Sequence, residues 1–168
     1  MPLSLYDASI PLFIRSLESM AKFLEKGRAF ADEHAMPHAT LLEARLYEDM
    51  GPLTSQVQRA SDSAKFAAVR VGQVENVALP DTETSFDELQ ARIAATVALL
   101  KAVPTTAMDG REEAEIVVET PHRSFSFAGR DYILHFAVPN FFFHVTTAYA
   151  LLRMKGVPVG KMDYLGNR

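Results

Sequence analysis

Two side chains near the C-terminus have types and spacing that could support chemistry. Asn140 and His144 are four residues apart, so on a helix they project in the same direction, about 40° apart. Their neighbours Phe141, Phe143 and Val145 are apolar, which is typical of a helix at the centre of a bundle. A neutral imidazole in such a place can bind a metal, act as a base or satisfy a structural hydrogen bond. The sequence leaves these three roles open.

The other histidines do not indicate a second site. His34 and His38 have the four-residue spacing of a metal pair. Pro37 disfavours helical dihedrals at the residue before it, so we expect an exposed linker there. His135 lies nine residues before His144 and nearly opposite to it on an ideal helix. We therefore do not group His135 with Asn140 and His144.

The bulk composition excludes several classes of protein. A chain of 168 residues fits a single domain, 1–168. It has no cysteine, which excludes a disulfide framework, a thiolate zinc site and a cysteine nucleophile. The net charge is −4 and the basic residues are scattered, which argues against a nucleic-acid partner. The apolar run at 93–100 is far shorter than the ~20 residues that span a bilayer. The first residues lack the pattern of a signal peptide. We expect a cytoplasmic protein without a membrane partner.

Four helices are needed to position Asn140 and His144. Apolar residues recur at three- and four-residue spacing in four stretches, which cover about 10–33, 49–72, 85–103 and 131–156. Asp49 is the expected N-cap of the second stretch, and Gly72 its expected left-handed end. Thr84 or Ser85 should cap the third stretch, and Gly156 should end the fourth.

Before the last helix, the spacing of apolar residues changes from every three or four residues to every second residue. Residues 115–120 and 123–127 alternate in polarity around a Pro-His turn, which predicts a β-hairpin. Pro139 falls inside the last helical pattern, where its missing N–H predicts a kink. The expected fold is therefore mainly all-α: four helices, with a short hairpin before the last, Pro-kinked helix.

Three stretches carry a resemblance to a known family: LYDASIPLFIRSLESM, EDMGPLTSQVQRASDSAK and VPNFFFHVTTAYALLRMKGVPVGKMDYLG. Over nearly its whole length the chain resembles a mostly bacterial family of unknown function. That family looks like a branch of the DinB/YfiT-like superfamily of proposed metalloenzymes. The resemblance implies a DinB-like four-helix bundle, often dimeric, and some members transfer or isomerise using low-molecular-weight thiols.

The resemblance also implies where a metal would lie. The superfamily's metal site typically uses one histidine on the second helix and an H-x-x-x-H pair on a late helix. Here the late pair is Asn140-x-x-x-His144, and Gln56 matches the second-helix position, with Asp49 as the fallback. Amides are weak ligands for zinc or nickel compared with imidazole. We expect a degenerate metal site with no firmly bound cofactor and at most a weakly bound divalent zinc or nickel ion.

Different functions follow from this comparison. The first is a non-catalytic bundle that binds a small molecule or a partner, as a homodimer, because cyclic dimers are the commonest oligomers. The alternative is a zinc- or nickel-dependent enzyme, such as a thiol-dependent transferase or isomerase. In that enzyme His144 is the ligand and Asn140 or Gln56 orients a water or the substrate. A third possibility is metal-free acid–base catalysis by His144. The sequence leaves open whether the protein is an enzyme.

Overall fold

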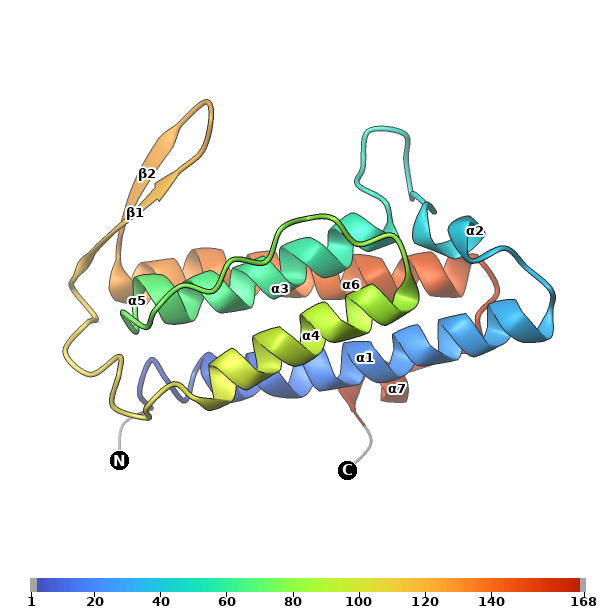
Figure 1. Cartoon of the computed structure of the whole chain (residues 1–168). Helices are drawn as coiled ribbons and strands as arrows, with labels where there is room; N and C mark the ends of the chain where they lie inside the picture. Colours follow the sequence, from blue (N-terminus) through green and yellow to red (C-terminus); the bar gives the residue numbers. More distant parts are fainter. Residues whose placement is uncertain (1–2, 167–168) are drawn as a thin grey trace.

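The computed structural model describes residues 3–166, and four long helices form its body (Figure 1). The long helices are α1 (Ile10–Glu33), α3 (Leu53–Arg70), α4 (Phe86–Lys101) and α6 (Val138–Met154). The shorter elements are α2 (His38–Leu42), β1 (Glu115–Glu119), β2 (Ser124–Ala128), α5 (Gly129–Asp131), the π-helix η1 (Tyr132–Ala137) and α7 (Lys161–Leu165). This confirms the predicted mainly helical bundle with a hairpin before its last helix. Within residues 3–166, no helix combines the length with the apolar character that a membrane crossing requires.

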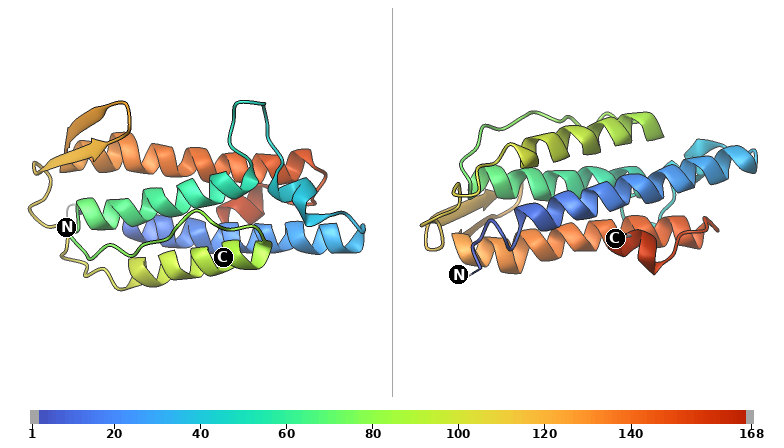
Figure 2. Two further views of the ribbon diagram at one scale, coloured as in Figure 1. Left: turned by 45° about the horizontal axis from the view of Figure 1, so that its top comes forward. Right: turned by 90° about the horizontal axis from the view of Figure 1, so that it is seen from below.

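The four long helices close into a ring around one core. Helix α3 packs against α4 and α6, and α1 packs against the same two helices (Figure 2). The stripe predicted on α1 is fully buried, as Phe13, Leu17 and Met20 show. Helix α3 contributes small side chains at its seam, including the buried Ala60 and Ala64. Because alanine has little volume, α3 can approach its neighbours closely, and this brings α3 side chains within reach of α6.

A polar strap returns the chain from the end of α3 to the start of α4 along the length of the bundle (Figure 1). The buried Arg92 guanidinium ties this strap down. It lies 2.9 Å from a Glu83 oxygen, 3.0 Å from Asp81 and 3.0 Å from Asp62 on α3. Burying an arginine is costly unless carboxylates surround it, so the strap and α3 are held together at this point. As a consequence, Asp62 already has a cationic partner.

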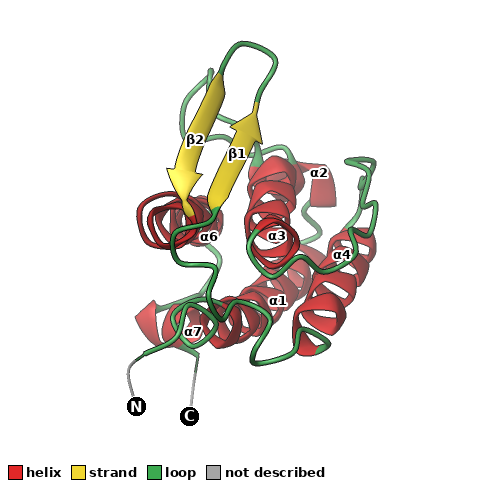
Figure 3. Ribbon diagram, turned by 90° about the vertical axis from the view of Figure 1, so that its left-hand side faces the viewer, coloured by secondary structure: helices red, strands yellow, loops and turns green. Residues whose placement is uncertain are grey.

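The hairpin stands on the end of the bundle beside η1 and α6 (Figure 3). Its strands are antiparallel, with Ile116 opposite Phe127 and Val118 opposite Phe125. Ile116 and Val118 are buried, and the Phe127 ring packs against two aromatic rings of η1, those of Tyr132 and Phe136. A two-stranded hairpin is marginal alone, so these contacts stabilise it.

The disruption predicted at Pro139 takes the form of a π-helix. The chain is helical from Gly129 through Met154, and the π-helical turns of η1 end just before Pro139, which lies in the first turn of α6. Proline cannot donate an i→i−4 hydrogen bond, and a π-turn absorbs an extra residue in the ladder. Helical structure therefore continues on both sides of the proline.

Two predicted helix ends are wrong and two are confirmed. Helix α3 does not begin at Asp49: it begins at Leu53 after Pro52, and Asp49 is exposed in the preceding loop. Pro52 stands at the N-cap position with an extended ψ, and its fixed φ sets the start of the helix, which has no side-chain cap.

At the other end of α3, the left-handed residue is Gln73 and not Gly72. A Cβ at Gly72 would lie 2.7 Å from the Ala68 carbonyl oxygen, so this glycine serves a close backbone approach. Ser85 does cap α4 with a capping box, and Gly156 has the expected positive φ after α6.

Candidate functional site

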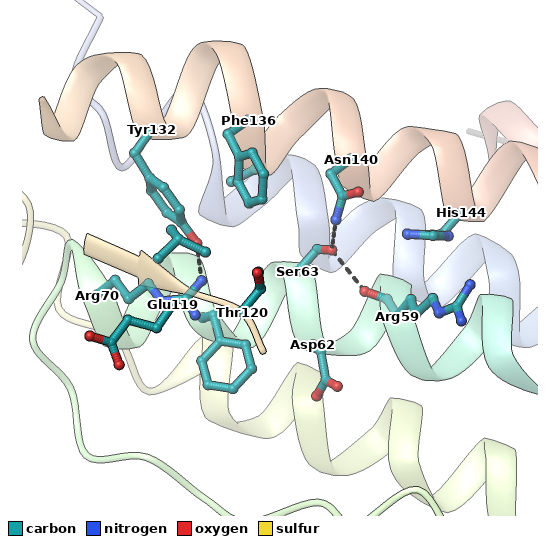
Figure 4. Close-up of a pocket in the computed structure, with 13 residues that line it drawn as sticks. Arg59, Asp62, Ser63, Arg70, Glu119, Thr120, Tyr132, Phe136, Asn140 and His144 are labelled. Atoms are coloured by element: carbon teal, nitrogen blue, oxygen red, sulfur yellow. Dashed lines mark hydrogen bonds between the residues drawn. The ribbon is translucent and has the colours of Figure 1, made fainter. Parts of the chain in front are cut away.

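A cavity of about 320 Å³ lies between α3, the η1–α6 helix and the hairpin (Figure 4). Helix α3 supplies one wall, η1 and α6 supply the opposite wall, and the end of β1 borders it. Its lining residues are Arg59, Asp62, Ser63, Phe66, Arg70, Val118, Glu119, Thr120, Tyr132, Phe136, Ala137, Asn140 and His144. The mixture of aromatic walls and a few convergent polar groups is typical of small-molecule sites.

The π-helix explains why four residues spaced by four share this cavity. Tyr132, Phe136, Asn140 and His144 all line it. In an α-helix, residues four apart drift forward by about 40° per step. A π-turn holds more residues than an α-turn, so the same spacing drifts backward there. The two drifts offset each other across η1 and α6, and the four side chains remain on one face.

A hydrogen bond to Gln56 on α3 fixes the orientation of the His144 ring. Its Nδ1 lies 2.7 Å from Gln56 Oε1, and Gln56 Nε2 donates to the Gly51 carbonyl at 2.9 Å. The second bond orients the amide, so its oxygen faces the imidazole. An amide oxygen only accepts hydrogen bonds, which assigns the proton of the neutral ring to Nδ1. Nε2 is then the ring atom with a lone pair that a ligand can use.

The charge state of His144 follows from its surroundings. Its side chain is only 7% exposed. Burial, and secondarily the positive charge of Arg59, lower the pKa of His144 from 6.5 to about 4. The imidazole is therefore neutral at pH 7. General bases work best with a pKa near the working pH, so His144 is a weak base there and a good hydrogen-bond acceptor.

Asn140 is held one turn before His144. Its Nδ2 donates to Ser63 Oγ at 2.7 Å, and Ser63 Oγ donates to the Arg59 carbonyl at 2.7 Å (Figure 4). The amide nitrogen is thus used within the protein. Among residues 3–166, Asn140 Oδ1 makes no hydrogen bond. It is a second acceptor at the same end of the cavity as His144 Nε2.

The opposite end of the cavity is aromatic and cationic. Arg70 Nη1 donates to the Tyr132 hydroxyl at 3.0 Å, and its guanidinium lies 4.6 Å from the centre of the Phe66 ring. Burial raises the pKa of Tyr132, although the Arg70 hydrogen bond opposes this effect. Tyr132 is therefore a neutral phenol that holds the arginine in place.

The donors in this cavity do not fit a tightly held zinc or nickel ion. Such an ion takes three or four strong ligands. The cavity offers one imidazole nitrogen and two carboxylates, Asp62 and Glu119, and Asp62 is already paired with Arg92. Gln56 Oε1 is occupied by the Nδ1 proton of His144, and Asp49 does not line the cavity. Among the described residues no group of three or more His, Cys, Asp or Glu is placed to hold a metal. The structure thus brings Gln56 and His144 into direct contact, with Asn140 one turn away.

Sequence analysis missed several lining residues. Arg59, Ser63, Phe66 and Arg70 recur at three- and four-residue spacing on α3, beside the apolar seam. That spacing is a signal that they share a face of the helix. The partner of that face could not be identified from the spacing alone.

Comparisons with known proteins agree with this architecture. Residues 5–165 match the family described as Domain of unknown function (DUF1993). A crystal structure of a DinB family member protein from Shewanella denitrificans is similar with a TM-score of 0.88 and 35% sequence identity. That similarity covers 98% of this chain and 93% of the other. A comparison with curated proteins gives no match. Since one family pattern and one solved structure each cover almost the whole length, the chain belongs to the DUF1993 family and has a DinB-like fold.

Proposed function

We propose that this protein is a non-catalytic, small-ligand-binding helical bundle with a degenerate metal site. The observation that carries this proposal is the lock between His144 and Gln56. In this hydrogen bond the Nδ1–H of His144 donates to the neutral Gln56 amide, and Nε2 is left as an acceptor that faces the cavity. The same positions correspond, by family resemblance, to the ligands of a metal site. Any divalent ion would have one strong ligand here and would be held weakly.

Further features of the cavity support binding without catalysis. The Ser63 hydroxyl donates to the Arg59 carbonyl, so it is not activated by a base. The pKa of His144, about 4, gives little driving force for proton abstraction at neutral pH. The cavity volume of about 320 Å³ lies at the small end of the range for ligand clefts. These features favour a small ligand held by hydrogen bonds and aromatic contact.

The experiment that tests the proposal is a ligand screen on full-length protein purified without an affinity tag. A panel of small organic acids, amines and neutral aromatics is added, and amide resonances are followed by NMR. We expect shifts that cluster at Ser63, Asn140 and His144. His144→Gln should change the binding, whereas His135→Gln should not, because His135 is exposed and outside the cavity.

Two results would overturn the proposal. One is a metal, zinc or nickel, that copurifies in stoichiometric amount and supports turnover. The other is metal-free turnover of any panel member that is lost in His144→Gln and retained in His135→Gln. Either result would support the enzyme alternatives instead.

We propose in addition that the protein forms a homodimer through the outer face of α6. Phe143 is 55% exposed and Met154 is 51% exposed. They are eleven residues apart and so lie about 20° apart on the helix. Large apolar side chains gathered on one helix face favour association. Light scattering on the full chain tests the proposal, and a monomer at all concentrations would contradict it.

A further inference from the structure

The cavity contains two arginines that no described carboxylate neutralises. Arg59 and Arg70 line it, and neither forms an ion pair within residues 3–166. Asp62 also lines the cavity, but its Oδ1 is paired with Arg92 at 3.0 Å and Lys65 at 3.4 Å. Glu119, on the exposed edge of the hairpin, is the other carboxylate of the lining. The lining therefore carries two cations and two carboxylates, and its two arginines form no ion pair among the described residues.

The Arg70 guanidinium is already oriented in a way that suits the binding of a planar anion. The Tyr132 hydroxyl accepts one of its N–H groups, and the Phe66 ring lies under its plane. A guanidinium has five N–H donors in a fixed fork, and a carboxylate accepts two of them in parallel. Because the side chain is already oriented, little conformational entropy is lost when an anion binds. Arg59, by contrast, has an exposed side chain.

The acceptors lie further along the cavity than this cation. Arg70 and Ser63 are seven residues apart on α3, which corresponds to about 10 Å along the helix. Ser63 holds Asn140, whose Oδ1 accepts, and His144 Nε2 lies one turn further on. The rings of Phe66 and Phe136 and the side chain of Val118 line the space between.

Building on the proposed function, we infer that the ligand is an aromatic organic acid with a hydrogen-bond donor at its far end. The carboxylate binds Arg70, the ring lies between Phe66 and Phe136, and the donor bonds to Asn140 Oδ1 or His144 Nε2. With its proton on Nδ1, facing Gln56 Oε1, the neutral His144 cannot donate from Nε2. The far group must therefore be an O–H or N–H and not a second carboxylate.

Three small probes test this inference. They are 4-hydroxyphenylacetate, its neutral analogue 4-hydroxyphenylacetamide, and phenylacetate, which lacks the far donor. Calorimetric titration of the full chain should show the hydroxy acid binding at least tenfold more tightly than the amide. Phenylacetate should bind several-fold more weakly than the hydroxy acid. NMR shifts should place all three in the cavity.

Matched variants test whether Arg70 binds the carboxylate of the ligand. Arg70→Gln should weaken the hydroxy acid at least tenfold and leave the amide unchanged. Arg130→Gln removes the same charge from an exposed arginine outside the cavity, and it should bind like the wild type. Tyr132→Phe keeps the ring but frees Arg70 and should weaken the acid several-fold. This variant gives the answer independently if Arg70→Gln does not fold.

The outcomes separate this inference from the proposed function. Equal binding of acid and amide, or equal behaviour of Arg70→Gln and Arg130→Gln, overturns the acid inference while the cavity remains a binding site. Failure of all three probes to bind also overturns it, and the broader ligand panel then decides the proposed function by itself.

Discussion

Replacing His144 with a side chain that does not titrate should remove a large part of the protein's acid sensitivity. Burial and Arg59 lower the pKa of His144 to about 4 in the folded state, against 6.5 when the residue is unperturbed. Protonation therefore favours the unfolded chain. The stability that the neutral imidazole contributes is complete above pH 6.5 and is lost as the pH falls toward 4.

The magnitude follows from the two pKa values. Their difference corresponds to about 3 kcal/mol once both states are protonated. Between pH 7 and pH 5, linkage gives a loss of about 2 kcal/mol in the free energy of unfolding. The full value applies to a well-buried group, and the His144 side chain is only 7% exposed.

Urea unfolding of wild type and His144→Gln at pH 7 and pH 5 measures this loss directly. Glutamine can still bond to Gln56, and every other titrating group is shared, so their contributions cancel in the difference. We expect wild type to lose about 2 kcal/mol more than the variant over this range. Equal losses in the two proteins, or an NMR titration of His144 near 6.5, would refute the assignment of a buried, neutral imidazole.

Three further predictions concern the same lock, the dimer and a helix end. Gln56→Leu leaves the Nδ1 proton of His144 without an acceptor and should lower the free energy of unfolding by about 1–3 kcal/mol; an unchanged urea midpoint would contradict the hydrogen bond. Phe143→Ser should convert the proposed dimer to a monomer in light scattering without lowering the melting temperature, since this ring is 55% exposed. Gly156 has a φ of 90°, so Gly156→Ala should cost about 1–2 kcal/mol. Gly160→Ala, at a φ of −130° with open space around it, should cost less than Gly156→Ala when the thermal denaturation of the two variants is compared.

The helices could be predicted because their signal is local. An apolar stripe buries one face whatever the neighbouring helix is, and all four long helices appear where the stripes predicted them. The ends of the helices are harder to predict, because several neighbouring residues could each start or stop a helix. At α3 the extended backbone of Pro52 displaced the cap predicted at Asp49.

The π-helix could not be predicted, because the sequence signal was a proline alone. A proline inside a helix can bend it or can be accommodated by a change of hydrogen-bond ladder. Here the rings of Tyr132 and Phe136 pack on Phe127 of the hairpin, with ring centres 6.1 and 5.4 Å away. These contacts are made between distant parts of the chain, and they favour the arrangement that keeps both rings on the cavity side.

The candidate site was predictable in part for the same reason. Asn140 and His144 share a face because of helix geometry alone, which four-residue spacing reveals. Whether Gln56 faces His144 depends on the register of α3 against α6, which no local pattern contains. Only family resemblance pointed to Gln56. The hydrogen bond between Gln56 and His144 shows that two of the residues grouped by the resemblance lie in direct contact.

The electrostatics of this site bear on two of the proposals, that a divalent ion is held weakly and that the ligand is an acid. A ligating histidine usually donates its second N–H to a carboxylate or carbonyl, which makes it a better ligand. Here the acceptor is an uncharged carbonyl oxygen, that of the Gln56 amide, and burial and then Arg59 lower the pKa of His144. A charge that repels one proton repels a divalent cation about twice as strongly at the same distance. At the other end of the cavity the oriented Arg70 guanidinium is the partner proposed for the carboxylate of the ligand. Amides at the positions where the resemblance implies imidazoles are thus expected to weaken the binding of a divalent ion, and the proposed preference for an acid depends on Arg70 at the other end of the cavity.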